Sequence, residues 1–243
     1  MTDKPLILAV ETSGRTGSVA AAAGGELLAE KSLSAPMKHS VELFEAMSNL
    51  LERFERKPKE VEQVYISIGP GSFTGLRIAA TFAKIMHLAN NVKIVAVDTL
   101  DVIAENTTDF TEKTKTPVKK IAAILDAKRG QFFVAAYENK GRQREKVLPD
   151  CLMTNEQFLE KFAGGTEVVW LLGEGLVYYK EKFKSQGIDF VDDSYWWPKA
   201  AKVHKLGWKM ALDGKFTDAL TLQPTYLQRP DIKQKSSQCK AKT

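Results

Sequence analysis

The order of predicted elements is the same in the two halves of the chain, and this repetition constrains the fold more than any other feature. Apolar runs at 6–10, 18–23 and 26–33, separated by Gly-rich turns, predict three strands that form a meander. The pattern returns at 120–125, 131–137 and 143–148. In each half, segments with helical and strand periodicity then alternate. The sequence therefore predicts a duplicated α/β unit with two similar lobes and a cleft between them.

The other periodic segments complete this arrangement. Helical spacing predicts helices at 38–56, 74–90, 99–105, 154–162, 176–185 and 200–212, and apolar runs predict strands at 61–68, 93–97 and 167–172. The segment 109–117 is polar and has no periodicity, so we place the boundary there. This gives an N-terminal lobe (1–108), a C-terminal lobe (109–228) whose last helix can pack back on the first lobe, and a basic tail (229–243) expected to be disordered.

Composition and charge exclude several classes of protein. The chain is 44% hydrophobic and 27% charged, which is typical of globular proteins, and no run of 18 apolar residues suggests a membrane helix. Cys151 and Cys239 lie too far apart to indicate a disulfide framework or a zinc site, so we expect a reducing, cytoplasmic location. The tail carries most of the net charge of +5, with five basic residues and one acidic residue. The nearly neutral body argues against an independent RNA-binding protein, and whether the tail contacts RNA stays open.

A glycine-rich motif, Gly69-Pro-Gly-Ser-Phe-Thr-Gly-Leu-Arg77, lies between a predicted strand and a predicted helix. Backbone N–H groups at such a helix start can bind an anion, and Gly69, Gly71 and Ser72 are the candidates. The motif does not match the Walker A, Rossmann or nucleophile-elbow patterns. The alternative is that its glycines form only a tight turn, and composition does not decide between the two.

Two hairpin loops, one in each half, carry polar residues. Glu11, Thr12 and Ser13 open the first loop, and Asp126 opens the second. Each loop by itself can be an ordinary turn. Together they match the arrangement of the sugar kinase, Hsp70 and actin superfamily, in which one hairpin from each lobe holds a nucleotide in the cleft.

The predicted helices of the first lobe carry more apolar side chains than one buried face needs. Between 74 and 90 only four residues interrupt the apolar surface, so this helix is either a central core helix or one that also contacts a partner protein. The candidate partner residues are Phe44, Met47, Leu51, Ala79, Phe82, Ala83 and Met86.

The histidines give no sign of a metal site. His39, His87 and His204 are widely separated, and no helix presents two imidazoles on one face. No catalytic Ser/His/Asp or Cys/His set can be nominated either. We therefore name no metal ligand and no catalytic residue.

The motif at 69–77, together with Glu11-Thr-Ser, resembles the TsaB (YeaZ) family of bacterial tRNA threonylcarbamoyladenosine biosynthesis proteins. Further matching segments are His39-Ser40, 97–100, 122–130 and 224–229, where Gln228 is inserted into the family's Pro-x-Tyr-Leu-Arg pattern. The resemblance covers nearly the whole chain but is weak over 140–215. It implies two ribonuclease-H-like lobes of the sugar kinase/Hsp70/actin (ASKHA) type.

The resemblance also implies a partner, the paralogous catalytic subunit TsaD. TsaD carries a metal-binding His-x-x-x-His where this chain has Thr99 and Ile103, and Ile103 offers no donor atom to a metal. We therefore expect that no cofactor is tightly bound and that ATP or ADP and metal belong to partner subunits. The polar loops would then be vestigial phosphate loops.

The implied function is that of a non-catalytic subunit of the complex that transfers threonylcarbamoyl to adenosine 37 of tRNAs. The chain would activate TsaD, help to recruit the ATPase subunit TsaE, meet tRNA only through the complex and form a homodimer in isolation. The alternative is a free-standing ATP-dependent kinase or acyl-phosphate enzyme of the same superfold, with Glu11 or Asp126 as its catalytic acid. The family is often labelled a glycoprotease homologue, but nothing in this sequence supports proteolysis.

Overall fold

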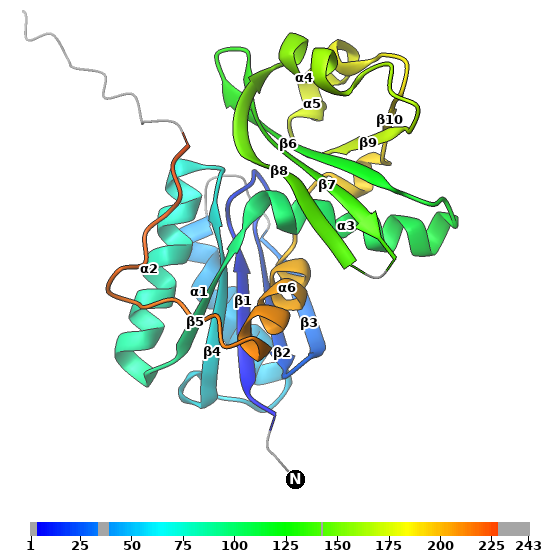
Figure 1. Cartoon of the computed structure of the whole chain (residues 1–243). Helices are drawn as coiled ribbons and strands as arrows, with labels where there is room; N and C mark the ends of the chain where they lie inside the picture. Colours follow the sequence, from blue (N-terminus) through cyan, green and yellow to red (C-terminus); the bar gives the residue numbers. More distant parts are fainter. Residues whose placement is uncertain (1–3, 34–38, 142, 228–243) are drawn as a thin grey trace, which may run out of the picture.

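The computed structural model describes residues 4–33, 39–141 and 143–227, and it places them in two lobes, one above the other in Figure 1. The elements are, in chain order, β1 (Leu6–Glu11), β2 (Ser18–Ala23), β3 (Glu26–Ser32), α1 (His39–Arg53), η1 (Pro58–Glu60), β4 (Val61–Gly69), α2 (Phe73–Asn90), β5 (Lys93–Asp98), α3 (Thr99–Thr114), β6 (Lys120–Lys128), β7 (Gln131–Lys140), β8 (Gln143–Thr154), α4 (Asn155–Phe162), β9 (Val169–Leu172), α5 (Leu176–Tyr179), η2 (Lys180–Phe183), β10 (Ile188–Phe190), η3 (Asp193–Tyr195) and α6 (Ala200–Leu212).

The described residues form two five-stranded sheets with the same topology. The first sheet has the order β3-β2-β1-β4-β5, and the second has the order β8-β7-β6-β9-β10. In each sheet the first three strands are antiparallel, and the last two add in parallel. This confirms the predicted duplication and the two-lobed ASKHA-type fold.

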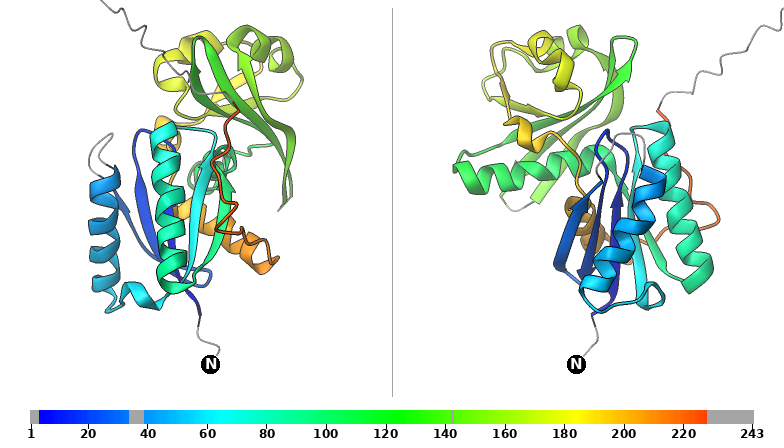
Figure 2. Two further views of the ribbon diagram at one scale, coloured as in Figure 1. Left: turned by 90° about the vertical axis from the view of Figure 1, so that its left-hand side faces the viewer. Right: turned by 180° about the vertical axis from the view of Figure 1, so that it is seen from behind.

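Strict alternation along β1 gives the first sheet two buried faces. Leu6, Leu8 and Val10 face the core under α1 and α2, whereas Ile7 and Ala9 face the core under α6. Figure 2 shows α1 and α2 side by side on one face of this sheet, with α6 on the opposite face. Because both faces are covered, β1 and β2 are apolar except at one end, where Glu11 and Ser18 stand next to the connecting loop.

Helix α3 is longer than the sequence predicted and lies between the two lobes. The segment 109–117 was expected to have no regular structure, but α3 continues to Thr114. Phe110 explains the extension, since it packs in the core of the second lobe beside Trp170 and Tyr195. Polar residues outnumber apolar ones in the last turns of α3, so the sequence of this segment shows no helical periodicity of apolar residues.

The C-terminal part of the chain returns to the first lobe, as was expected of the last helix, although the limits of the second lobe differ from those predicted. Helix α6 packs on β1, β2, β4 and β5. After α6, Thr217 pairs with Ile94 of β5, and the Thr225 N–H donates to the Ile68 carbonyl oxygen of β4. The second lobe therefore occupies about residues 99–198, in place of the predicted 109–228. The predicted basic tail, 229–243, lies outside the described residues.

Smaller differences occur in the second lobe. The predicted helix 176–185 is a single short turn, α5, followed by the 3-10 turn η2. Strand β8 runs to Thr154, where the prediction stopped at 148, and the three-residue strand β10 was not predicted. Strand β10 is too short for its alternation to stand out in the sequence.

Candidate functional site

An apolar groove runs between α1 and α2 on the outer face of the first lobe. Its volume is about 350 Å³, and it is lined by Leu43, Phe44, Phe73, Thr74, Arg77, Ile78, Thr81, Phe82 and Ile85. Phe44 is 44% exposed and Ile85 is 45% exposed, although both side chains are apolar. Phe44 also packs edge-on against Phe82, with ring centroids 5.6 Å apart, so the groove has a rigid aromatic floor. Exposed apolar side chains gathered in a groove are typical of a protein-binding surface.

Two of the seven predicted partner residues, Phe44 and Phe82, line the groove. Of the seven candidates only Phe44 is exposed; Met47, Leu51, Ala79, Phe82, Ala83 and Met86 are buried in the first lobe's own core. The physical reason is the helical phase, because the face of α2 that carries its alanines packs on β4. The face that points outward carries Arg77, Ile78, Thr81 and Ile85 instead.

Two residues that line the groove are held by a residue far away in sequence, Tyr226. The Phe73 and Tyr226 rings lie 5.2 Å apart, and the Arg77 guanidinium lies 3.7 Å from the Phe73 ring centroid. The Arg77 Nε–H also donates to the Tyr226 hydroxyl at 3.2 Å. The returning C-terminal segment therefore contacts two residues that line the groove, Phe73 and Arg77.

The polar loop after β1 is held by a buried carboxylate. Glu11 is fully buried and accepts hydrogen bonds from the Ser13 N–H and Ser13 hydroxyl, both at 2.5 Å, and from the Ser67 hydroxyl. Burial raises the pKa of Glu11 above its ordinary value, and these hydrogen bonds partly offset that effect. Because both of its oxygens accept hydrogen bonds from residues of its own lobe, Glu11 fixes the conformation of the loop.

The glycine-rich motif packs directly on this loop. The Ser72 N–H donates to the Ser13 carbonyl oxygen at 2.7 Å, and the Thr12 hydroxyl donates to the Gly75 carbonyl oxygen at 2.7 Å. A Cβ at residue 75 would overlap the Thr12 carbonyl oxygen, so only glycine fits. Ser72 caps α2, as the sequence predicted, by accepting from the Gly75 N–H.

The structure thus brings most of the predicted polar residues together. Thr12 and Ser13 contact the motif at Gly71, Ser72 and Gly75, and the peptide bond between Gly69 and Pro70 is cis. Asp126 belongs to the second lobe, on the other side of the contact between the two lobes, which we call the seam. Its carboxylate accepts from the Lys128 N–H at 2.8 Å and pairs with the Lys128 ammonium at 2.7 Å. The pKa of Arg15 in the first-lobe loop is raised, chiefly by its hydrogen bond with Tyr178, and the negative charge of Asp126 adds to this effect.

Glu174 is a seam residue that the sequence analysis missed. It stands in the Gly173-Glu174-Gly175 turn after β9, the place in the second sheet that Gly69-Pro70-Gly71 takes in the first. Its two carboxylate oxygens accept from the Arg15 N–H at 3.1 and 3.2 Å. Burial raises the pKa of Glu174 to about 7; Glu11 acts in the same direction, and the Arg15 N–H and the charges of Arg15 and Lys128 oppose it. A glutamate between two glycines was the available signal, but it also describes an ordinary turn.

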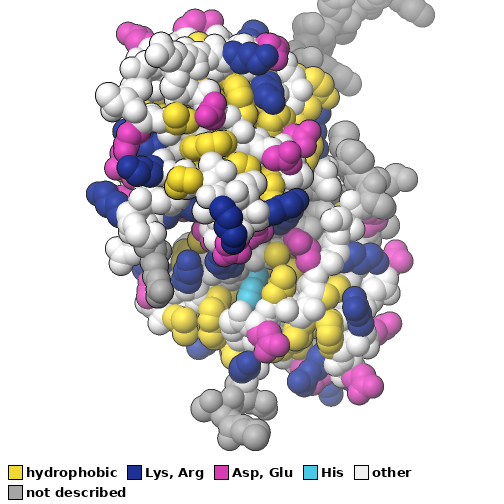
Figure 3. Space-filling view, turned by 90° about the vertical axis from the view of Figure 1, so that its right-hand side faces the viewer, with side chains coloured by type: hydrophobic (Ala, Val, Ile, Leu, Met, Phe, Trp, Pro, Cys, Tyr) yellow, Lys and Arg dark blue, Asp and Glu magenta, His cyan; other side chains and the backbone are white. Residues whose placement is uncertain are grey.

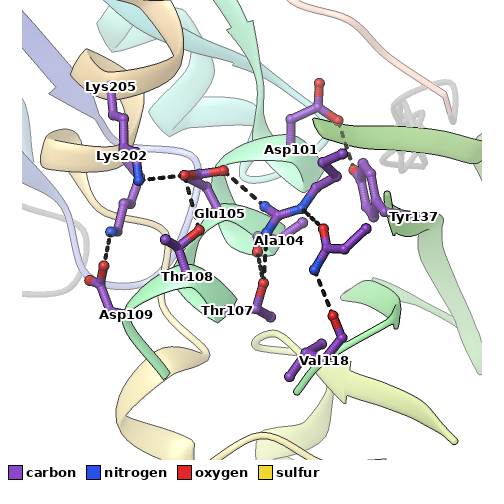
Figure 4. A network of polar contacts seen from close by, with 12 residues as sticks. Asp101, Ala104, Glu105, Thr107, Thr108, Asp109, Val118, Tyr137, Lys202 and Lys205 are labelled. Carbon is purple, nitrogen blue, oxygen red and sulfur yellow. Dashed lines mark hydrogen bonds and ion pairs between the residues drawn. The ribbon is translucent and has the colours of Figure 1, made fainter. Parts of the chain in front are cut away.

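A second polar network ties α3 to both lobes on the other side of the seam. Glu105 of α3 lies between Arg144 of β8, at 2.9 Å, and Lys205 of α6, at 2.8 Å (Figure 4). One turn further along, Asp109 pairs with Lys202 of α6 at 2.5 Å. Burial by itself would raise the pKa of Glu105, but Arg144 and Lys205 hold it below its ordinary value.

Metal-ligating side chains do not cluster in the part of the chain that the structure describes. His204 shares a hydrogen bond with the Gly24 carbonyl oxygen, and His87 shares one with the Val92 carbonyl oxygen. The side chain of His39 lies outside the described residues. Thr99 and Ile103 are both fully buried at the start of α3. Among the described residues no helix has the length and hydropathy needed to cross a membrane.

Comparisons with known proteins agree with this architecture. The model of the family "TsaD: tRNA N6-adenosine threonylcarbamoyltransferase" matches residues 30–206. The tRNA threonylcarbamoyladenosine biosynthesis protein TsaB of Bacillus subtilis (strain 168) is 30% identical over 175 residues, which cover 72% of this chain and 73% of that protein. The TsaB protein of Escherichia coli (strain K12) is 24% identical over 228 residues, which cover 91% of this chain and 94% of that protein.

Two solved structures from Pseudomonas aeruginosa are also similar. YeaZ has a TM-score of 0.75 at 21% identity, and a protein described as similar to peptidase YEAZ has a TM-score of 0.79 at 22% identity. Each alignment covers 92% of this chain and all of the other chain. At these identities the two structures support the two-lobed fold alone.

Proposed function

The chain belongs to the family of tRNA threonylcarbamoyladenosine biosynthesis proteins that contains TsaB, and we propose that it is a non-catalytic scaffold subunit of the complex that transfers threonylcarbamoyl to adenosine 37 of tRNAs. Its part in tRNA threonylcarbamoyladenosine biosynthesis follows from the family. The finer proposal is that it binds and activates a TsaD-like catalytic subunit. It also helps to recruit a TsaE-like ATPase to the complex. We expect the complex to act in the cytoplasm.

The groove between α1 and α2 is the observation that carries this proposal. Phe44, Phe73 and Ile85 expose apolar surface there, and desolvating such surface drives protein association. A paralogue with the same fold has two equivalent helices on its first sheet. Two such helix pairs can pack face to face, with ridges of one pair in the grooves of the other.

A charge placed in the groove tests this interface. We expect Ile85→Glu to weaken binding of the TsaD-like subunit by about tenfold or more, because a carboxylate buried in an apolar protein interface loses its hydration. Leu212→Glu is the matched control, since Leu212 is 68% exposed but lies on α6, on the opposite face of the sheet. Calorimetric titration of both folded variants gives the affinities. Equal binding by the two would contradict the proposed interface.

The same surface supports a homodimer in isolation. A patch that pairs with an equivalent patch on a paralogue can also pair with itself about a two-fold axis. Homodimer and heterodimer would then compete for one groove. Sedimentation analysis of the chain alone should show dimers that Ile85→Glu converts to monomers.

The polar seam supports a role without catalysis by this chain alone. Glu11 is buried and accepts hydrogen bonds from Ser13 and Ser67, and Asp126 is paired with Lys128. Neither carboxylate is therefore free to act on a substrate. We infer that nucleotide and metal are held by the partner subunits. ATP hydrolysis by the purified chain would contradict this and favour the free-standing kinase or acyl-phosphate enzyme instead.

Contact with tRNA is proposed to occur only through the complex. On the face drawn in Figure 3, basic and acidic side chains are interspersed over both lobes. Nucleic-acid surfaces instead gather basic side chains into one patch.

A further inference from the structure

Arg77 differs from the other residues that line the groove, because it is the charged one among them. It lies on α2 one turn after Phe73, and its side chain is exposed. Among the described residues it forms no ion pair, and the two side chains that hold its guanidinium are Phe73 and Tyr226. The groove therefore combines an apolar floor with a cation that has no counter-charge of its own.

The Arg77 guanidinium has a fixed orientation. Its central carbon lies 3.7 Å from the centroid of the Phe73 ring, so the planar group covers the face of that ring. Its Nε–H donates to the Tyr226 hydroxyl at 3.2 Å, and the Phe73 and Tyr226 rings are themselves in contact. Because the side chain is already ordered, a partner that binds it loses little further side-chain entropy.

The guanidinium keeps hydrogen-bond donors that these contacts do not use. The Tyr226 hydroxyl takes the N–H on Nε, and none of the described residues accepts from the two terminal nitrogens. The N–H groups on those nitrogens form the edge of the fork that binds a carboxylate through two parallel hydrogen bonds. An apolar interface removes the water from this edge, so the partner must supply an acceptor or lose affinity.

Tyr226 is a fixed acceptor because the chain is held on both sides of it. The Thr225 N–H donates to the Ile68 carbonyl oxygen of β4 at 2.8 Å. On the other side, Leu227 packs against the core of the second lobe. The Tyr226 hydroxyl is thus presented to α2 by a segment that touches both lobes.

We propose that Arg77 determines the specificity of the groove by pairing with a carboxylate of the partner protein, and that Tyr226 is the positioning residue for this contact. The inference rests on the proposed function, since the partner is the TsaD-like subunit that the groove is proposed to bind. The surface that fits is an apolar helix pair with an aspartate or glutamate opposite Arg77. An equally apolar surface without this carboxylate would leave the guanidinium buried and without an acceptor, and the groove would discriminate against it.

Removing the charge tests the contact. We expect Arg77→Met to weaken binding of the TsaD-like subunit by about tenfold or more, because the partner carboxylate loses its cation. Arg53→Met is the matched control, since the Arg53 guanidinium also lies near an aromatic ring, 5.7 Å from the Phe54 centroid, but does not line the groove. Calorimetric titration of both folded variants gives the affinities. Unchanged binding by Arg77→Met would overturn the proposal.

The variant Ile85→Glu, titrated in the same way, separates this inference from the proposed function. If Ile85→Glu weakens binding and Arg77→Met does not, the groove binds the partner but the carboxylate contact does not exist. If Ile85→Glu leaves binding unchanged, the groove is not the interface, and the role of Arg77 is refuted with it.

Exchanging the charges identifies the carboxylate. Arg77→Glu should weaken binding more than Arg77→Met does, because two like charges then meet across the interface. The exposed aspartates and glutamates on the equivalent two helices of the partner are then changed to lysine one at a time. One of these partner variants should restore the binding of Arg77→Glu by about tenfold or more. If none of them restores it, Arg77 does not meet a carboxylate and the proposal fails.

The positioning role of Tyr226 has a separate test. Tyr226→Phe keeps a ring beside Phe73 but removes the acceptor of the Arg77 Nε–H. We expect partner binding to weaken by about threefold in the otherwise unchanged chain and to lose nothing more in an Arg77→Met background. A residue with a merely structural role would cause the same loss in both backgrounds, and that result would remove Tyr226 from the proposal.

Discussion

At the scale of single residues, two carboxylates at the seam differ in what surrounds them. Glu11 is fully buried and receives three hydrogen bonds from its own lobe, whereas Glu174 comes from the other lobe and lies between positive and negative neighbours. Sequence predicted Glu11 because it stands in a loop of small polar residues after a buried strand. It did not predict Glu174, because the loop that receives this side chain lies 159 positions away.

The raised pKa of Glu174 makes stability depend on pH. Its value in the folded chain is about 7, against about 4.5 in the unfolded chain, so the folded state binds more protons between these values. The free energy of unfolding should therefore fall as the pH rises from about 4.5 through 7. Glu174→Gln cannot titrate, so at pH 8 it should be more stable than the unchanged chain by about 1 to 3 kcal/mol, with little difference near pH 4.5.

Urea unfolding at a series of pH values measures this difference. The charged groups that act on Glu174 are Glu11, Arg15 and Lys128, and of these Glu11 is the other carboxyl group. Glu11 is present in both chains, so its contribution largely cancels in the comparison. A stability difference that does not change between pH 4.5 and 8 would show that Glu174 titrates normally.

At the scale of elements, α3 depends on side chains from two other parts of the chain, β8 and α6. Its face with Asp101 and Glu105 meets Lys146 and Arg144 of β8, two pairs at matching spacing. Lys205 approaches the same Glu105 from α6. The local sequence could not predict these ion pairs, because the spacing of Asp101 and Glu105 on α3 matches that of their partners only when α3 packs against β8. The amphipathic pattern of α2 predicted a second apolar face, but Ala79 and Ala83, which were assigned to it, lie on the buried face of the helix.

Removing the cation from this network should destabilise the chain. Arg144→Met keeps most of the side-chain packing but leaves the buried Glu105 with one cation in place of two, so we expect a loss of about 1 to 3 kcal/mol in the free energy of unfolding. Lys140→Met is the control, because the Lys140–Glu145 pair is exposed on both sides. Chemical unfolding of both variants gives the comparison. A loss no larger than in the control would mean that Arg144 adds nothing to the network.

At the scale of the whole molecule, the repeat of elements predicted the two lobes and the order of their strands, but not where one lobe ends. The two sheets have the same topology because each half carries the same succession of strands and helices. The packing of α6 on the first lobe was expected, but the boundary at 108 was misplaced because α3 is polar in its last turns. Ala200 and Val203 complete the core around Tyr65, and only the fold reveals this.

The distribution of buried residues predicts which fragment folds alone. Every fully packed member of the second lobe's core lies between Leu100 and Trp196, so a fragment 99–198 contains that core and should unfold cooperatively. A fragment 109–198 follows the boundary expected from sequence but lacks Leu100, Ile103 and Ala104. Each large apolar side chain removed from a core costs about 2 to 5 kcal/mol, and a whole domain is stable by only about 5 to 15 kcal/mol. The shorter fragment should therefore lack a cooperative transition in thermal unfolding followed by circular dichroism. Equal cooperativity in the two fragments would place α3 outside the second lobe and restore the boundary at 108.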